Sequence, residues 1–371
     1  MKFSIDRAAL LRSLAHVQSV VERRNTIPIL SNVLLKAEDG VLTLSATDMD
    51  MEINESVAAT VSAPGATTAP AHTLHDIVRK FPDGSQVEIA LNAEGTQMNV
   101  RAGRSDFKLS CLPTADFPEI TTTELPFGFS IPASELRALI DRTKFAMSTE
   151  ETRYYLNGIY VHAADNDGVA VLRAVATDGH RLARFEMPLP ESAGDMPGVI
   201  IPRKAVGELR KLIDEAADSI QISLSENKVR FSFDHVVLTS KLIDGTFPDY
   251  QRVIPQGNDK IVEVDPKVFT GAIDRVSTIS DGKSRALKIT LHGKQMILSA
   301  SSPEAGSATE EMEVNGDSDI EIGFNAKYLL DITSQIEGEG CRLTLADAAS
   351  PTIIQDNSDP SALYVLMPLR V

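Results

Sequence analysis

The segment ATDGHRL, residues 176–182, places an acid, an imidazole and a guanidinium around a glycine. Asp178 and His180 could take part in hydrolysis if a nucleophile or a metal lay beside them. The sequence contains no HExxH, GxSxG, P-loop or glycine-rich dinucleotide motif that would supply such a partner. We therefore predict no catalytic residue, no metal site and no cofactor, and keep a hydrolase that uses His180 as an alternative.

The same segment also suits a strand, a turn and a second strand. An Asp-Gly pair favours a tight turn because glycine adopts positive φ without strain, and local hydrogen bonds would satisfy His180. A third interpretation makes the segment one wall of a binding surface. The elements around it discriminate between these interpretations.

Composition restricts the class of protein. The chain has 371 residues, which suggests two or three domains, and no apolar run long enough for a membrane helix. Its only cysteines, Cys111 and Cys341, lie far apart in the sequence, which argues against a disulfide framework and, with a charged N-terminus, favours the cytoplasm. The net charge of -16 by itself argues against a nucleic-acid partner.

The sequence repeats one pattern three times: a short strand, a capping residue and an amphipathic helix. The three copies are FSIDRAALLRSLAHVQSVV from Phe3, FSIPASELRALIDRTKFAM from Phe129 and VEVDPKVFTGAIDRVSTI from Val262. Each copy has a second helix and then alternating, strand-like runs such as VEIALN, IQISLS and CRLTLA. This predicts an α+β fold of three tandem domains. Proline-rich phrases place their boundaries at 1–125, 126–253 and 254–371.

A step of about 100° per residue assigns an apolar side to each of the six predicted helices. In the fifth helix, for example, it puts Val268, Ala272, Val276 and Ile279 inside. In every helix a basic residue lies opposite the apolar side. These outward residues are Arg12, Arg79, Lys80, Arg142, Lys204, Lys211, Lys267 and Lys327. Surface helices are commonly charged, which is one explanation. The other is that cations are collected on one face of an otherwise acidic chain, which could then bind DNA.

Over its whole length the sequence resembles the beta subunit family of bacterial DNA polymerase III, the sliding clamps. The resemblance rests on TIPILSNVLL, AGRSDFKLSCLPTADFPEI, RYYLNGIY, VATDGHRLA, SKLIDGTFPDYQRVIP and YVLMPLRV. It implies three tandem clamp domains per chain and a ring of two head-to-tail protomers. Helices would line a central hole for double-stranded DNA, antiparallel sheets would form the outer wall, and Arg24 would join the DNA-facing residues.

The resemblance also implies a hydrophobic pocket for partner peptides of the Gln-Leu-x-Leu-Phe type. Such peptides belong to the alpha subunit of DNA polymerase III, the clamp loader, other polymerases and repair proteins. The matching residues are Leu156, Thr177, Gly179, His180, Arg181, Leu182, Pro248, Arg252, Val253, Val365, Leu366, Met367, Pro368, Leu369 and Arg370. His180, Arg181 and Arg252 would hold polar groups of the peptide. Leu369 and Gln251 depart from the residues common in the family.

The contact between protomers is assigned in the same way. Phe107, Lys108 and Leu109 are expected on an edge strand that meets the partner protomer, near an apolar cluster with Ile279. The alternative is that this strand belongs to the core of the first domain. A scaffold of repeated domains that binds only proteins is a further alternative, and it would show no DNA retention.

Overall fold

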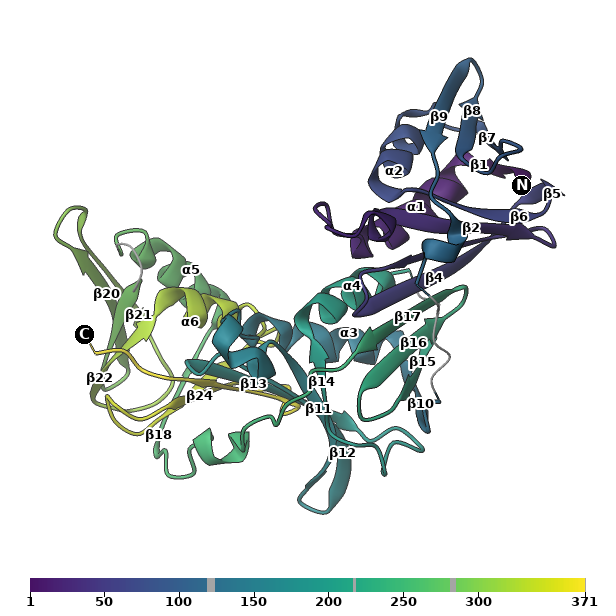
Figure 1. Ribbon diagram of the computed structural model, residues 1–371. Coiled ribbons are helices and arrows are strands. Elements are labelled where there is room, and N and C mark those ends of the chain that lie inside the picture. Colours follow the sequence, from purple (N-terminus) through teal and green to yellow (C-terminus); the bar gives the residue numbers. More distant parts are fainter. Residues whose placement is uncertain (119–123, 216–217, 281–284, 371) are drawn as a thin grey trace. The chain divides into compact units, whose positions relative to one another are not determined.

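The computed structural model describes residues 1–118, 124–215, 218–280 and 285–370 (Figure 1). Residue contacts divide the chain into two compact units. The first comprises Met1–Leu136, Pro190–Pro197 and Lys204–Leu242, and the second comprises Arg137–Leu189, Gly198–Arg203 and Ile243–Val371. The middle repeat of the sequence is therefore divided between the two units.

The first unit contains two antiparallel sheets. A five-stranded sheet has the order β5-β1-β7-β8-β9, and the first eight-stranded sheet has the order β10-β15-β16-β17-β4-β3-β2-β6. The strands of the five-stranded sheet are β1 (Lys2–Asp6), β5 (Thr60–Ala63), β7 (Gln86–Leu91), β8 (Gln97–Ala102) and β9 (Ser105–Ser110). Those of the eight-stranded sheet are β2 (Asn32–Glu38), β3 (Val41–Thr47), β4 (Met51–Ala58), β6 (Gly65–Pro70), β10 (Phe127–Pro132), β15 (Ser219–Leu224), β16 (Lys228–Phe233) and β17 (Val236–Lys241).

The second unit also contains two antiparallel sheets. The second eight-stranded sheet has the order β14-β11-β12-β13-β25-β24-β23-β18, and a four-stranded sheet has the order β21-β20-β19-β22. The strands of the eight-stranded sheet are β11 (Gly158–Asn166), β12 (Val169–Thr177), β13 (Arg181–Pro188), β14 (Val199–Pro202), β18 (Lys260–Val264), β23 (Cys341–Leu345), β24 (Thr352–Asp356) and β25 (Ala362–Leu366). Those of the four-stranded sheet are β19 (Ala286–His292), β20 (Gln295–Ser302), β21 (Gly306–Glu313) and β22 (Ile320–Asn325).

The two eight-stranded sheets have the same plan. Strand by strand, β10-β15-β16-β17-β4-β3-β2-β6 corresponds to β18-β23-β24-β25-β13-β12-β11-β14. In each sheet a strand of one repeat pairs with a hairpin strand of the repeat before it. Strand β17 of the second repeat pairs with β4 of the first, and β25 of the third repeat pairs with β13 of the second. Each sheet is thus continuous across a repeat boundary, and this makes a repeat-to-repeat junction rigid.

Helices lie beside the sheets of both units. They are α1 (Arg7–Val20), α2 (Ala71–Lys80), α3 (Ala133–Asp141), α4 (Arg203–Ile213), α5 (Pro266–Ser277) and α6 (Ala326–Thr333). Asp6, Asp265 and Asn325 each accept two backbone N–H bonds at the start of α1, α5 and α6. These bonds satisfy N–H groups that have no partner within the helix. The capping residues predicted before α1 and α5 are confirmed.

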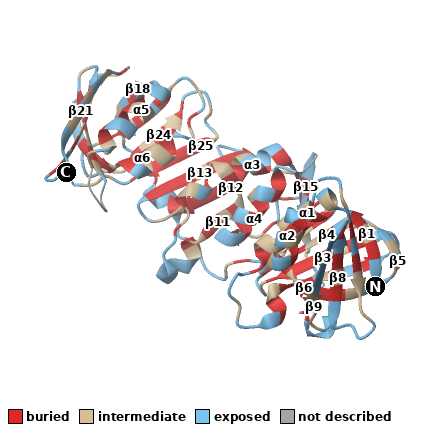
Figure 2. Cartoon of the chain, turned by 90° about the horizontal axis from the view of Figure 1, so that it is seen from above, coloured by how far each residue is buried: buried red, intermediate tan, exposed pale blue. Residues whose placement is uncertain are grey.

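Burial agrees with most of the predicted helix faces and corrects one of them. Leu10, Leu14 and Val17 of α1 are completely buried. In α5 the prediction for Val268 is wrong, because this side chain is 51% exposed, and the buried positions are Phe269, Ala272, Ile273 and Val276. These four have the i, i+3, i+4, i+7 spacing of one helix face. Figure 2 shows the same separation of buried and exposed residues on the strands and helices.

Short 3-10 turns connect several of these elements: η1 (Pro28–Ser31), η2 (Thr114–Asp116), η3 (Lys144–Ala146), η4 (Glu151–Leu156) and η5 (Tyr250–Val253). Two of them, η4 and η5, contribute to the site described below. Within the part of the chain that the structure describes, no helix is both long enough and apolar enough to cross a membrane.

Candidate functional site

The ATDGHRL segment is the end of β12, a tight turn and the start of β13. The Asp178 carboxylate accepts hydrogen bonds from the backbone N–H of His180 at 2.9 Å and of Arg181 at 3.0 Å. The Thr177 hydroxyl donates to the Arg181 carbonyl at 2.6 Å and accepts from the Gly179 N–H at 3.1 Å. These bonds give Thr177 and Asp178 a structural role in the turn, and the segment has the geometry of an Asx turn.

Gly179 is required in this turn for two reasons. Its φ is +87°, in the left-handed region that other residues adopt only with strain. A Cβ at this position would also lie 2.7 Å from Nη1 of Arg153. Any side chain here would therefore displace Arg153 as well as strain the backbone.

An apolar cluster joins three segments that are distant in the sequence. Leu156 ends η4, Leu182 lies on β13 and Val365 lies on β25, and all three are buried in one cluster. The other buried members are Val175, Ile200, Phe247, Tyr250, Ile254 and Leu363, with Tyr155, Tyr160, Ile243 and Ile353 packed against them. The structure therefore brings together predicted pocket residues from the second repeat and from the end of the chain.

Two predicted pocket residues are exposed although their side chains are large and apolar: Val253 is 49% exposed and Met367 is 40% exposed. Pro248 and Arg252 are exposed too, and the Arg252 guanidinium contacts the Asp249 carboxylate at 2.8 Å. Arg252 is 85% exposed, so its guanidinium is free to move toward a ligand.

The C-terminal residues are attached to the turn by backbone hydrogen bonds. Leu366 pairs with Arg181 and Val365 with Leu182 across the β13 and β25 ladder. The Met367 N–H then donates to the His180 carbonyl at 2.9 Å. Two residues later, the Leu369 N–H donates to the Gly323 carbonyl of β22 at 2.8 Å. Its neighbours in the sequence are the half-buried Pro368 and the exposed Arg370.

The Arg181 side chain, predicted to hold polar groups of a peptide, does not face the apolar cluster. Successive side chains of a strand point to opposite faces, so Arg181 lies on the face opposite to Leu182. Its guanidinium is 8% exposed and bonds Asp331 at 2.5 Å, the Phe145 carbonyl at 2.6 Å and Asp178 at 3.1 Å. It also lies 4.3 Å from the centre of the Tyr328 ring. Arg181 therefore fastens the turn to α6, on the face of the strand opposite to Leu182 and the apolar cluster.

The His180 side chain is also on the α6 side of the turn. Its ring is 6.1 Å from that of Tyr328, nearly parallel to it. Both rings line a hollow of about 460 Å³ together with Phe145 and Asp331. No Ser or Cys hydroxyl or thiol hydrogen-bonds the imidazole among the bonds of the described residues, and no three His, Cys, Asp or Glu side chains there are arranged to hold a metal ion. His180 contributes to the tail attachment through its carbonyl.

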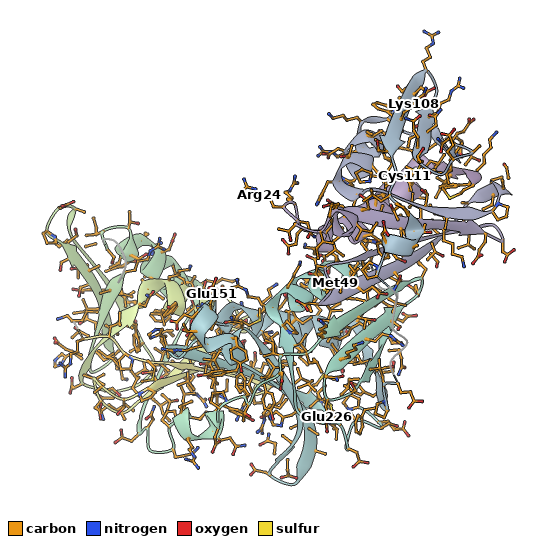
Figure 3. All side chains as sticks on the ribbon, in the orientation of Figure 1. Arg24, Met49, Lys108, Cys111, Glu151 and Glu226 are labelled. Atoms are coloured by element: carbon orange, nitrogen blue, oxygen red, sulfur yellow. The ribbon has the colours of Figure 1, made fainter. Side chains whose placement is uncertain are left out.

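Most of the predicted DNA-facing residues are exposed on helices or at helix ends. Arg24 projects from the loop after α1 (Figure 3). The other exposed residues are Arg12, Arg79, Lys80, Lys204, Lys211, Lys267 and Lys327. Lys204 is the least free of them, because its ammonium contacts both Glu22 and Asp48. Burial alone would lower the pKa of Lys204, but the hydrogen bonds and the charges of Asp48 and Glu22 together outweigh it and raise this pKa.

The prediction that Arg142 faces outward is wrong. Its side chain is only 12% exposed, its guanidinium contacts Glu337 at 3.1 Å and it donates to the Gln335 carbonyl. Helix α3 ends at Asp141, so Arg142 lies beyond the last residue to which the helical repeat applies. The exposed arginine of α3 is Arg137.

The proposed protomer contact falls on sheet edges. Strand β9 is an edge of the five-stranded sheet, and β21 is an edge of the four-stranded sheet. On β9, Phe107 is 40% exposed, Lys108 is exposed (Figure 3) and Leu109 is half-buried. Ile279, just after α5, is half-buried. Phe107 is not a core residue of the first domain, because its side chain is 40% exposed, although its ring lies against the buried Phe81 with ring centres 5.8 Å apart.

Sequence reasoning missed a buried polar network next to the apolar cluster. Arg173 and Glu186 pair across β12 and β13, and Arg173 donates to the hydroxyl oxygen of Tyr250 in η5. Their positions carried a signal: Arg173 is four residues before Thr177, and Glu186 is four residues after Leu182. A hairpin closed by the DGH turn necessarily makes them cross-strand neighbours.

Three family models match the chain in succession. The N-terminal domain of the DNA polymerase III beta subunit matches residues 1–121, the central domain residues 130–249 and the C-terminal domain residues 251–370. The chain belongs to the DNA polymerase III beta subunit family, the beta sliding clamps. The predicted resemblance and the three tandem clamp domains are thereby confirmed.

Individual relatives support the same assignment over the full length. The beta sliding clamp of Caulobacter vibrioides is 53% identical over 372 residues, covering 100% of both chains. The crystal structure of the Caulobacter crescentus beta sliding clamp has a TM-score of 0.98 at 53% identity and covers 100% of this chain and 99% of that one. A Bartonella birtlesii sliding clamp bound to griselimycin has a TM-score of 0.97 at 51% identity, with 100% of both chains covered. As a member of this family, the chain is an accessory subunit of a DNA polymerase and not a catalytic one.

Proposed function

We propose that two copies of the chain close head to tail into a ring around double-stranded DNA, and that each copy binds peptides of its partners in the apolar cluster of the second unit. The observation that carries the peptide site is the cluster of Leu156, Leu182 and Val365, together with two exposed apolar residues: Val253, which precedes Ile254 of the cluster, and Met367, which follows strand β25. A pocket of Leu, Val and an adaptable Met suits the Leu and Phe side chains of a peptide.

The peptides come from proteins that act on DNA: the alpha subunit of DNA polymerase III, the clamp loader, other polymerases and repair proteins. Tethering them to an encircling ring would keep them on DNA through many cycles. We place the domain boundaries at residues 1–125, 126–253 and 254–371, and the protein in the cytoplasm. The spacing of the three matched family domains supports these boundaries.

Exposed cations on the helices support sequence-independent contact with DNA. Lys and Arg side chains attract phosphates without fixing a register, which permits sliding. The acidic excess of the chain, 52 Asp and Glu against 36 Lys and Arg, would repel DNA from the other faces. A scaffold that binds only proteins would need no such separation of charge.

Removing two of these cations should weaken the binding of DNA in a salt-dependent way. We expect the double variant Arg12→Ala with Lys267→Ala to make log affinity fall less steeply with log salt. The magnitude of the slope should decrease by about 1 for each phosphate that is no longer neutralised. The measurement is fluorescence anisotropy of a short labelled duplex at several salt concentrations. Lys36→Ala is the matched control, because Lys36 is an exposed cation on strand β2. An equal change in slope for the control would contradict the assignment of the helices to DNA.

A further inference from the structure

A buried ion pair lies on the same face of the second eight-stranded sheet as the apolar cluster. Arg173 is 4% exposed and Glu186 is 7% exposed. Arg173 Nε donates to Glu186 Oε1 at 2.7 Å, and Asn166 donates to the other carboxylate oxygen at 2.9 Å. Burying two charges has a desolvation cost that often equals their attraction, so such a pair is weak evidence for a role in stability alone.

The pair continues into a chain of hydrogen bonds that ends on the linker turn η5. Arg173 Nη1 donates to the Tyr250 hydroxyl oxygen at 3.0 Å, and His162 Nε2 is 3.0 Å from the same oxygen. His162 Nδ1 is 2.8 Å from the Ala163 carbonyl. A carbonyl only accepts, so Nδ1 carries the proton and Nε2 accepts the Tyr250 hydroxyl proton. Burial lowers the pKa of His162, which favours this neutral form.

Tyr250 attaches η5 to the sheet through hydrogen bonds of its hydroxyl group, beside the buried Phe247 and Ile254. Its side chain is 6% exposed, and Phe247, just before it, stacks on Tyr160 with ring centres 4.9 Å apart. The bonds within η5 are long: the N–H groups of Arg252 and Ile254 donate at 3.4 and 3.3 Å. The neighbouring exposed residues form the linker wall of the proposed pocket, defined here as Pro248, Arg252 and Val253. Their position therefore depends on what holds Tyr250.

The first eight-stranded sheet provides an internal comparison. Its turn has the same bonds: Thr47 donates to the Met51 carbonyl at 2.9 Å and accepts from the Met49 N–H at 3.0 Å. Thr43 lies four residues before Thr47, as Arg173 lies four residues before Thr177. Its cross-strand partner on β4 is Ser56, which therefore corresponds to Glu186. The hydroxyls of Thr43 and Ser56 are 3.4 Å apart and exposed. The hairpin thus forms without a buried charge pair, and the fold alone does not require one.

We propose that Arg173, Glu186 and His162 are positioning residues for peptide binding, which hold Tyr250 and thereby fix the linker wall beside the apolar cluster. This inference rests on the proposed function, because it assigns these residues to the same peptide site. None of the three lies among the residues expected to touch the peptide. They act on the peptide only through Tyr250 and η5.

The test is Tyr250→Phe in the full-length chain, which removes one hydroxyl and keeps the ring in the core. We expect the dissociation constant for a fluorescein-labelled Gln-Leu-Ser-Leu-Phe peptide to rise about fivefold. This is smaller than the full effect of losing one hydrogen bond to a charged group, because Tyr250 acts on the peptide indirectly. Backbone amides of residues 250–254 should exchange hydrogen faster, while those of β12 and β13 keep their protection. A purely structural role would lower the melting temperature without this local change.

The matched control is Thr43→Val with Ser56→Ala, which removes the corresponding pair in the first sheet and should leave peptide affinity unchanged. A dissociation constant for Tyr250→Phe within twofold of the unaltered chain would overturn the inference, as would unchanged exchange of residues 250–254. Failure of the unaltered chain to bind the peptide would overturn the proposed pocket instead. The exchange measurement separates these cases, because it needs no peptide.

Discussion

A chain lacking Met367 to Val371 is expected to bind no Gln-Leu-x-Leu-Phe peptide. The deletion removes the exposed Met367 side chain and the backbone bond from Met367 to the His180 carbonyl, so the turn and Val253 no longer enclose a leucine. Strand β25 ends at Leu366 and keeps its pairing with β13. The oligomeric state should therefore be unchanged. Fluorescence anisotropy of a labelled peptide measures the loss.

Two point variants accompany this deletion. Met367→Ala keeps the backbone bond and removes only the thioether side chain, so its effect should be intermediate. His180→Ala should weaken binding by about 1 kcal/mol or less, the scale of a single hydrogen bond, because the imidazole lies beside Tyr328. Undiminished binding after the deletion would refute the pocket. A hydrolase would behave differently, since His180→Ala would abolish turnover and the deletion would matter little.

Phe107→Asp combined with Ile279→Asp is expected to convert the dimer into monomers of 40.2 kDa. Phe107 is exposed on the edge strand β9, and an edge strand has free backbone groups for pairing with another chain. Two carboxylates buried in an apolar contact would each cost several kcal/mol, roughly the range for unpaired buried charge. Sedimentation velocity at micromolar concentration gives the mass.

The control for this pair is Val169→Asp. Val169 is 61% exposed at the start of β12, a strand of a different sheet from β9 and from β21, so the same chemical change there should leave a dimer. A double variant that still sediments as a dimer would show that the contact lies elsewhere on the molecule.

Local patterns in the sequence were enough to predict the repeats and the turn. Asp-Gly requires a tight turn, and Asp6 and Asp265 mark helix starts by their capping chemistry. The meeting of Leu156, Leu182 and Val365 depended on the family resemblance, because nothing local relates β13 to β25. Strands of different repeats pair within one sheet, and the repeated sequence pattern does not indicate which strands pair in this way.

The incorrect expectations have geometric causes. The helical repeat that predicts an outward Arg142 no longer applies after Asp141, and the strict four-residue spacing that predicts a buried Val268 drifts around the helix. Arg181 was grouped with Leu182, although alternation along a strand separates them. The Arg173 and Glu186 pair was missed because each residue was considered without its cross-strand neighbour.

Retention of the assembled protein on a nicked circular DNA is the measurement that tests the ring most directly. The protein is loaded on the circle by its clamp loader and passed through a gel-filtration column in moderate salt, before and after one restriction cut. A ring that encircles DNA stays on the circle and slides off the cut molecule, because its direct affinity for phosphates is weak and salt-sensitive. Equal retention on circular and linear DNA would contradict encirclement.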